Sequence, residues 1–230
     1  MSLLDLVFPK RCVNCKKAGD YVCQNCFIYI SFDVKPLCLI CDRPSFNNLT
    51  HPVCRKKYSI DGCFSAIAYN KIAQKLIYNF KYKPYLTDLK TFLSELFVES
   101  IIQNENFVKV LEKENFMFTP IPLYQSKLRK RGYNQSEILC KELSESFKLP
   151  YQNLLKRVKD TKNQFKLKRE DREENVKNAF QLDTKRYTLN AKNIFLVDDI
   201  VTTGSTLKEA AKILKRNGAN KVFGLTLARD

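Results

Sequence analysis

The residues that decide the fold are NIFLVDDIVTTGST, numbers 193 to 206. The continuous apolar run at the start of this stretch predicts a β-strand that is buried on both faces. Asp198 and Asp199 then stand at the carboxyl end of the strand, and a short hydroxyl-rich loop with Gly204 leads into a helix marked by apolar residues at 207–214. In open α/β sheets, ligands bind at this edge. The stretch therefore predicts an α/β fold and places a candidate ligand site within it.

The chemistry of the loop favours a phosphate. From Thr202 to Thr206 the chain offers successive backbone N–H groups, side-chain hydroxyls and the positive end of a helix, and Gly204 lets the backbone approach an anion closely. Asp198 and Asp199 repel phosphate, but they accept hydrogen bonds from paired hydroxyls and can assist a magnesium ion. Phosphate and diol recognition side by side describe a ribose 5-phosphate. The alternative is that the acid pair merely ends the strand and Ser205 or Thr206 merely caps the helix.

The rest of the body alternates strands with helices. The pattern predicts strands at 62–69, 115–123, 193–199 and 221–229, and helices over about 72–80, 86–101, 139–147 and 207–214. This order is typical of a mostly parallel sheet. We expect a loop at 124–135 and an exposed, highly charged excursion at about 156–180.

Composition limits the functional classes. The chain has 230 residues, with 40 Lys and Arg against 24 Asp and Glu, so its formal net charge is +16. This charge favours a polyanionic partner, unless it reflects a general basic bias of the source. No apolar run approaches the roughly 18 residues of a membrane span, and the first residues lack the pattern of a signal peptide. We expect a cytoplasmic protein, with peripheral attachment at the inner face of the membrane left open.

In such a reducing compartment the cysteines point to metal. Eight of the nine cysteines lie in the first 63 residues, and three pairs share the spacing Cys-x2-Cys. Two such knuckles complete a tetrahedral, closed zinc site, which is structural. We expect two sites, formed by these ligands: Cys12, Cys15, Cys23 and Cys26; Cys38, Cys41, His51 and Cys54. Interleaved pairing, Cys63 as the competing ligand and an empty second site remain open. The chain then divides into a cysteine-rich module, 1–60, and a body, 61–230.

Two basic clusters are candidates for nucleic-acid contact. The segment 75–85 interleaves Lys75, Lys81 and Lys83 with aromatic residues at 78, 80, 82 and 85. Lysines neutralise phosphates, and each exposed ring that stacks on a base contributes roughly 1 to 3 kcal/mol. The second cluster is Lys127, Arg129, Lys130 and Arg131, which could hold nucleic-acid phosphates, pyrophosphate or both. The alternatives are that Phe80 lies in the core with the tyrosines flanking it, and that the second cluster is a solvated loop.

The string LVDDIVTTGST, 196–206, resembles the 5-phosphoribosyl-1-pyrophosphate (PRPP) motif of type I phosphoribosyltransferases. No Walker A sequence is present, which argues against a nucleotide triphosphatase. With the zinc knuckles, PIPLYQSKLRKRGYNQSE at 120–137 and the segment 157–180, nearly the whole chain resembles the ComF family, its ComFC-type members in particular. The block Arg131 to Gln135 and the series Thr161, Gln164, Arg172, Asn175 and Phe180 are characteristic of it. His51 stands where the family usually has cysteine.

The resemblance implies a type I phosphoribosyltransferase-like sheet with flanking helices behind a small zinc-ribbon module. It implies that Asp198 and Asp199 hold the ribose hydroxyls as the catalytic pair, that residues Val201, Thr202, Thr203, Gly204, Ser205 and Thr206 hold the 5-phosphate, and that the loop after Pro122 meets pyrophosphate. Its cofactors would be structural zinc, magnesium and PRPP. It also implies a competence protein that handles single-stranded DNA during natural transformation, with other DNA-uptake proteins at the inner membrane as partners. The alternative is an active phosphoribosyltransferase of nucleobase or related metabolism.

Overall fold

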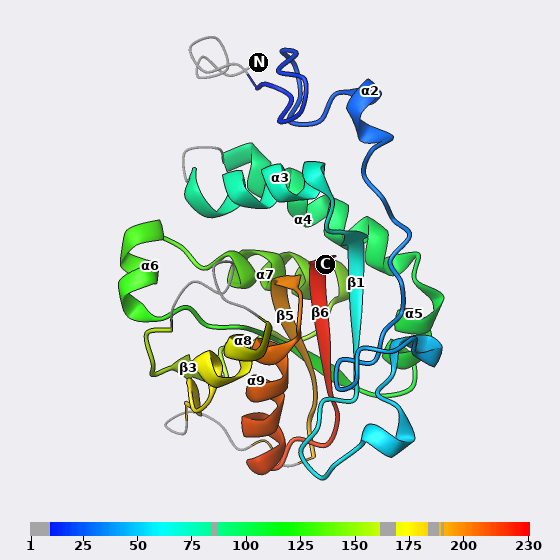
Figure 1. Ribbon diagram of the computed structural model, residues 1–230, viewed down its shortest axis with the longest axis vertical. Coiled ribbons are helices and arrows are strands. Elements are labelled where there is room, and N and C mark those ends of the chain that lie inside the picture. The colour runs from blue at the N-terminus through cyan, green and yellow to red at the C-terminus, as the bar shows by residue number, and fades with distance from the viewer. Residues whose placement is uncertain (1–9, 84–86, 162–168, 184–188, 190) are drawn as a thin grey trace.

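A computed structural model describes residues 10–83, 87–161, 169–183, 189 and 191–230. Its centre is a four-stranded sheet, all parallel, in the order β1-β6-β5-β2 (Figure 1). The strands are β1 (Gly62–Ala68), β2 (Phe116–Pro120), β5 (Asn193–Val201) and β6 (Val222–Arg229). Because all four run the same way, their carboxyl ends meet at one edge. The mostly parallel α/β fold expected from the sequence is confirmed.

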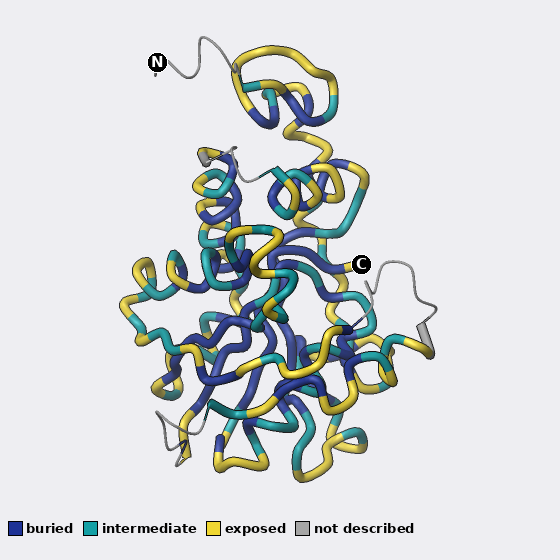
Figure 2. Tube along the Cα trace, turned by 90° about the vertical axis from the view of Figure 1, so that its left-hand side faces the viewer, coloured by how far each residue is buried: buried dark blue, intermediate teal, exposed yellow. Residues whose placement is uncertain are grey.

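The sheet is buried on both faces, as the dark central strands in Figure 2 show. In β5, Phe195 and Val197 face one hydrophobic core, whereas Ile194 and Leu196 face the other. This alternation follows from the two-residue period of a strand. It also explains the uninterrupted apolar run, because neither face of β5 meets water.

Helices cover the two faces unequally. One core includes residues from α3 (Lys71–Tyr82), α4 (Thr87–Ile102), α5 (Glu105–Leu111) and α7 (Gln135–Phe147). On the other face, α9 (Ser205–Arg216) packs on β5 and β6, and α8 (Arg169–Val176) packs on α9. The buried positions of α9 are Leu207, Ala210, Ala211 and Leu214 among others, so the predicted apolar stripe is confirmed.

Two segments differ from expectation. The region expected to be a loop contains a short helix, α6 (Gln125–Arg131), which ends at Gly132 with a φ of 80°. Its seven residues include one apolar side chain, so no helical period marks it. The excursion at 156–180 contains a two-stranded antiparallel sheet, β3 (Leu155–Arg157) with β4 (Phe180–Leu182), and α8 between them. Both α8 and β4 pack against α9. The composition of the charged segment alone does not predict these contacts.

The cysteine-rich segment makes two separate contacts with the body. Its first part, with the short helix α2 (Gln24–Phe27), reaches α3, where Lys75 donates to the Asn14 side chain at 3.0 Å and Asn70 donates to the Tyr29 carbonyl at 2.6 Å (Figure 1). Its second part includes the 3₁₀ turns η1 (Phe46–Asn48) and η2 (Pro52–Cys54) and covers the α9 side of the sheet, because Leu39 and Ile60 share the core of that face.

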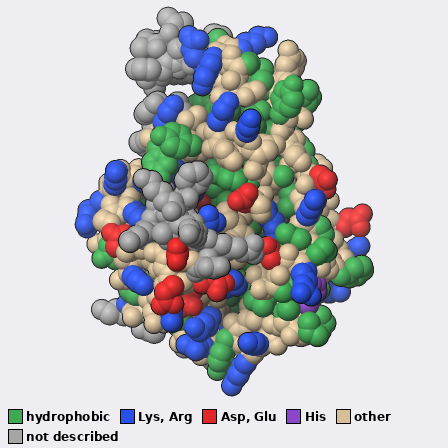
Figure 3. Space-filling model, viewed as in Figure 1, with side chains coloured by type: hydrophobic (Ala, Val, Ile, Leu, Met, Phe, Trp, Pro, Cys, Tyr) green, Lys and Arg blue, Asp and Glu red, His purple; other side chains and the backbone are tan. Residues whose placement is uncertain are grey.

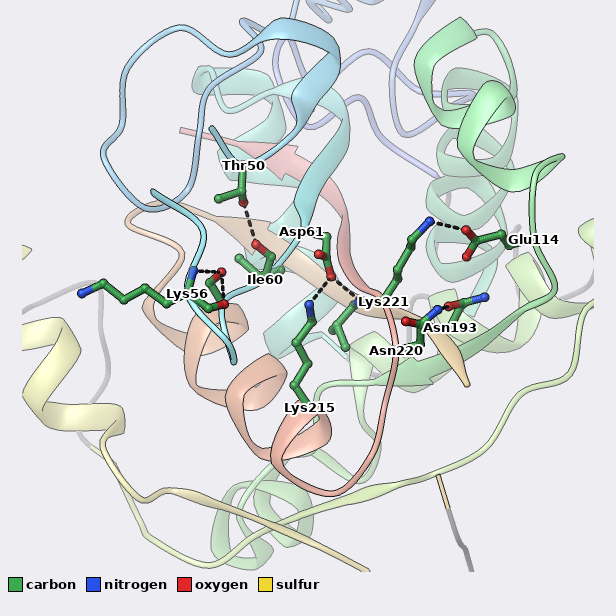
Figure 4. A network of polar contacts seen from close by, with 11 residues as sticks. Thr50, Lys56, Ile60, Asp61, Glu114, Asn193, Lys215, Asn220 and Lys221 are labelled. Carbon is green, nitrogen blue, oxygen red and sulfur yellow. Dashed lines mark hydrogen bonds and ion pairs between the residues drawn. The ribbon is translucent and has the colours of Figure 1, made fainter. Parts of the chain in front are cut away.

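The second part is anchored at the amino ends of the strands, as Figure 4 shows. Asp61 accepts a hydrogen bond from the Val222 amide at 2.8 Å and pairs with Lys215 of α9 at 2.7 Å. Nearby, Thr50 donates to the Ile60 carbonyl at 2.6 Å. Among the described helices, none combines the length and apolar character that crossing a bilayer would require.

Candidate functional site

The acid pair lies where β5 reaches the carboxyl edge of the sheet. Asp199 continues the face of Phe195 and Val197, so its side chain points towards α3 and pairs with Lys81, Nζ to Oδ2, at 2.9 Å. The Asp199 side chain is 9% exposed and that of Lys81 is 22% exposed. The sequence predicted that Lys81 contacts nucleic acid. In the structure, Lys81 turns inward and neutralises one of the two acids.

Asp198 has a different environment. Its Oδ1 accepts hydrogen bonds from the Ser136 hydroxyl and the Asp199 amide, each at 2.9 Å. Removal from solvent and the neighbouring Asp199 charge together raise the pKa of Asp198 to about 7, although Lys81 and Ser136 oppose the rise. Asp199 thus pairs with a lysine, whereas Asp198 changes charge near neutral pH.

The hydroxyl-rich loop turns from β5 into α9. Gly204, immediately before α9, has a φ of +69°, a conformation that glycine adopts at little cost. The Thr203 and Ser205 hydroxyls lie 2.7 Å apart, and Arg172 of α8 donates to the Thr202 hydroxyl at 2.8 Å. The first N–H groups of a helix have no acceptor inside it. Amides and hydroxyls of Thr202 to Thr206 therefore gather beside the acid pair, and Val201 lies buried beneath them.

A cluster of cations stands beside Asp198. Lys127 and Arg157 both hydrogen-bond to Thr161, through its carbonyl and its hydroxyl respectively. Burial and the charges of Arg157 and Arg131 lower the pKa of Lys127, although Asp160, 3.7 Å from its ammonium, opposes this. The Nε of Arg157 is buried without a hydrogen-bond partner among the described residues. These mutually repelling cations form a site suited to an anion with several charges.

Arg157 is the residue that sequence reasoning missed. Burial lowers the pKa of its guanidinium, whereas Asp198 opposes that change. The side chain also lies over the Phe180 ring, 5.2 Å from its centroid. Arg157 and Phe180 belong to β3 and β4, so pairing of these strands brings the arginine to the site. The sequence showed only an arginine in a charged segment.

The block Arg131 to Gln135 builds the corner between α6 and α7. Arg131 lies over the Tyr82 ring of α3, 5.2 Å from its centroid, and Tyr133 donates to the Phe80 carbonyl. Asn134 donates to the Ile121 carbonyl at 3.0 Å and so fixes the turn after β2. Ser136, which follows the block, reaches Asp198. The corner thus joins α3, the cation cluster and the acid pair.

The helix α3 presents rings as well as charges to solvent. The side chains of Tyr78 and Tyr82 are 59% and 43% exposed, and their ring centroids lie 4.9 Å apart. Phe80 is buried in the core, which agrees with the alternative that this ring packs inside the protein and does not stack on bases. Because Arg131 contacts Tyr82, the two predicted basic clusters join in space.

The other predicted cations near this face have different surroundings. Lys75 donates a hydrogen bond to Asn14 in the first part of the cysteine-rich segment, the first ribbon, which carries Cys12, Cys15, Cys23 and Cys26. Lys83, just after α3, is half-buried. Arg129 and Lys130 are exposed on α6. This helix lies at the left edge of Figure 1, and Figure 3, in the same view, shows Lys and Arg side chains in blue at that edge. Tyr85 and Gln164 lie outside the described residues.

Each predicted set of metal ligands comes together. The donor atoms of each of these sets lie within 4.8 Å of one another: Cys12, Cys15, Cys23 and Cys26; Cys38, Cys41, His51 and Cys54. Neither set is interleaved with the other. Cys63 is in neither: it is buried in β1, and burial raises the pKa of its thiol to about 11.

The donors suit zinc. His51 Nε2 donates to the Pro44 carbonyl at 2.8 Å, which leaves Nδ1, 3.3 Å from the Cys41 sulfur, as the ligand nitrogen. Burial opposes ionisation of Cys38, but hydrogen bonds from backbone amides outweigh it and lower the pKa of this thiol to about 7. Four nitrogen or thiolate donors around one point form a closed, structural zinc site.

Two cavities lie away from this edge. One, of about 280 Å³, is lined by residues 111–115 with Phe147 and Leu149, and the other, of about 310 Å³, lies between the first ribbon and α4. Neither includes the acid pair or the loop.

Comparisons with known proteins agree with this architecture. The model of the double zinc ribbon domain matches residues 3–57, and that of the phosphoribosyl transferase domain matches residues 133–229. Competence protein ComFC of Bacillus subtilis is 28% identical over 225 residues, 93% of this chain and 86% of the relative. Competence protein F of Haemophilus influenzae is 41% identical over 111 residues, 48% of each chain. DNA utilization protein YhgH of Escherichia coli is 39% identical over 110 residues, 47% of each chain.

The matches to the Haemophilus and Escherichia proteins span about half the length of those relatives, whereas the match to the Bacillus protein spans most of it. The two domain matches fall on the paired cysteines and on the part of the chain that contains β5 with its acid pair, α9 and β6. The chain therefore resembles a double zinc ribbon domain at residues 3–57 and a phosphoribosyl transferase domain at 133–229, and it is similar to competence protein ComFC over nearly its whole length.

Proposed function

We propose that this protein handles single-stranded DNA during natural transformation and that its carboxyl-edge site binds PRPP with magnesium. The observation that carries the proposal is the meeting of three groups at one edge: the acid pair, the loop 202–206 and the cations Lys127, Arg131 and Arg157. Each group matches one part of PRPP: the ribose diol, the 5-phosphate and the diphosphate.

The residues would divide the ligand between them. Amides and hydroxyls of the loop take the terminal phosphate, where the start of α9 adds positive potential. Asp198 and Asp199 accept hydrogen bonds from the ribose hydroxyls. Arg157, whose Nε has no hydrogen-bond partner among the described residues, leads the contacts to the diphosphate. Magnesium, when bound, neutralises part of the diphosphate charge.

The DNA contact would lie on the adjoining face of α3 and α6. Tyr78 and Tyr82 offer exposed rings on which bases can stack, and Arg131 lies against the second ring. The exposed Arg129 and Lys130 extend the positive charge along α6. The names of the relatives, competence and DNA utilization proteins, agree with a DNA substrate. We further propose that the protein works inside the cell beside other DNA-uptake proteins at the inner membrane.

An active phosphoribosyltransferase is the second candidate. The intact acid pair and loop favour it, because displacement of pyrophosphate at the anomeric carbon needs a ligand held in this way. Release of pyrophosphate from PRPP and magnesium with a panel of nucleobases tests this candidate. Turnover above the background would establish an enzyme, whereas binding without turnover would favour a regulatory or structural pocket.

Calorimetry with PRPP and magnesium tests the pocket. We expect binding by the wild-type protein and at least a tenfold loss of affinity in the D198N/D199N double variant. No heat of binding at millimolar PRPP would refute the pocket.

Binding of a fluorescent single-stranded oligonucleotide tests the DNA face. We expect Y78A/Y82A to bind more weakly, by roughly 1 to 3 kcal/mol for each lost stack. The matched control is F46A, because Phe46 is a ring 84% exposed on the second ribbon. Affinity should fall steeply between about 50 and 200 mM salt, and a flat response would contradict the proposal.

A further inference from the structure

The second zinc site and the phosphate loop meet at one contact. Leu39 lies between the ligands Cys38 and Cys41, is 4% exposed, and packs against Gly204 of the loop. A Cβ atom placed on Gly204 would stand 2.8 Å from Leu39 Cδ2 and 3.3 Å from Cδ1. The leucine side chain therefore closes one side of the loop.

We propose that Leu39 is a positioning residue for the phosphate loop, and that metal binding at Cys38, Cys41, His51 and Cys54 sets the loop's affinity for a terminal phosphate. The proposal rests on the proposed function, because the ligand is the 5-phosphate of that site. It assigns to the second zinc ribbon a role in ligand binding in addition to folding.

The loop needs external support. Gly204 adopts a left-handed conformation, and glycine has more conformational freedom to lose than any other residue. The side chains that hold the loop come from two directions: Arg172 of α8 reaches Thr202, and Leu39 covers Gly204. Without the leucine, one wall of the anion site would be open to water, and its amides would sample more orientations.

The position of Leu39 depends on the metal. The knuckle that carries it is a tight turn, in which the Cys38 amide donates to the Arg43 carbonyl at 2.9 Å and the Asp42 amide donates to the Cys38 carbonyl at 2.8 Å. A tetrahedral ion joins this turn to the segment that carries His51 and Cys54. When the ion leaves, the turn loses the bonds that join it to this segment.

The rest of the ribbon is held without the metal. Asp61 remains bonded to Val222 and Lys215 at the amino edge of the sheet (Figure 4). Loss of metal would therefore loosen the knuckle and Leu39 while the base of the ribbon stays attached. The effect on the loop is then local, which makes it measurable in a folded protein.

The first zinc site supplies a matched control. Its described contacts with the body include hydrogen bonds to α3, through Lys75 and Asn70, and an ion pair to α4, between Lys10 and Asp88 at 2.7 Å. It has the same number of metal ligands but does not touch Gly204. C15S should therefore remove one metal ion without affecting the loop.

The test compares L39A, C41S and C15S with the wild-type protein, and V53A is the control for L39A because Val53 is 94% exposed on the same ribbon. Bound zinc is counted by elemental analysis, amide hydrogen exchange is followed in peptides covering 200–207, and affinity for PRPP with magnesium is measured by calorimetry. We expect L39A to keep two zinc ions, to exchange faster in this segment, and to bind about tenfold more weakly, or 1.4 kcal/mol.

C41S should lose one zinc ion and reproduce both effects of L39A. C15S should lose one zinc ion and V53A should lose none. In both of these controls, the hydrogen exchange of 200–207 and the affinity for PRPP should equal those of the wild type. Unchanged exchange and affinity in both L39A and C41S would overturn the inference. Equally fast hydrogen exchange of the loop in C15S would overturn the inference too, because loss of metal from either site would then loosen the loop. If the wild-type protein binds no PRPP, the proposed function fails, while the exchange measurements still decide whether the knuckle holds the loop.

Discussion

The environment of Asp198 makes the stability of the protein depend on pH in a way that one substitution should abolish. The pKa of Asp198 is raised from 3.8 to about 7, mainly by removal from solvent and then by Asp199. A carboxyl group with a raised pKa favours folding while it is protonated. Its contribution is complete below about pH 4 and is lost as the pH rises through about 7.

The size of the effect follows from the shift. Between pH 5 and pH 7 the folded protein holds a proton on Asp198 that the unfolded chain has released. Each pH unit in this window therefore removes up to about 1.4 kcal/mol from the free energy of unfolding, or about 3 kcal/mol over the window. In D198N the side chain keeps its shape and can still accept from Ser136, but it has no charge to lose. The variant should therefore gain stability relative to the wild type as the pH rises.

Urea unfolding of both proteins at pH 5 and pH 8.5, followed by far-UV circular dichroism, measures this gain. Thiol protonation and metal release occur in both proteins, so they cancel in the difference between them. We expect the difference in unfolding free energy to grow by about 2 to 3 kcal/mol in favour of D198N. S136A should shift the window to higher pH, because it removes a hydrogen bond that lowers the pKa. A difference between wild type and D198N that is the same at both pH values would refute the reasoning.

Three further predictions concern stability. K81M removes the lysine that pairs with the Asp199 carboxylate, which is 9% exposed, and should lower the free energy of unfolding by roughly 1 to 3 kcal/mol in urea titrations. The control K83M breaks no described ion pair and should cost less than about 0.5 kcal/mol. Equal losses in the two variants would contradict the role of the pair. G62A places a Cβ 2.5 Å from the Asn48 carbonyl oxygen, so calorimetry should show a melting temperature lower by several degrees, and an unchanged one would show that the ribbon yields freely. The purified protein should contain two zinc ions, and EDTA should lower its melting temperature; one ion or none would contradict the paired sites.

The sequence by itself determined the features whose causes are local. A knuckle is set by two cysteines three positions apart, so the spacing predicted the candidate ligands but left their pairing open, and the structure brings each expected set together. The acid pair and the phosphate loop are contiguous with β5 and α9, and the strand and helix patterns were strong enough to place them at the carboxyl edge of a parallel sheet. Their roles towards a ligand remain predictions, but their adjacency is a property of the chain.

Tertiary structure decided which distant residues complete the site. Lys81 reaches Asp199 because α3 packs over the face to which that carboxylate points. The pairing of β3 with β4 brings Arg157 near enough for its charge to interact with Asp198. Leu39 covers Gly204 because the second ribbon occupies the α9 face of the sheet. None of these contacts has a period or a spacing in the sequence. They follow from burial of apolar surface shared between segments far apart in the chain, and that shared burial exists only once the chain has folded.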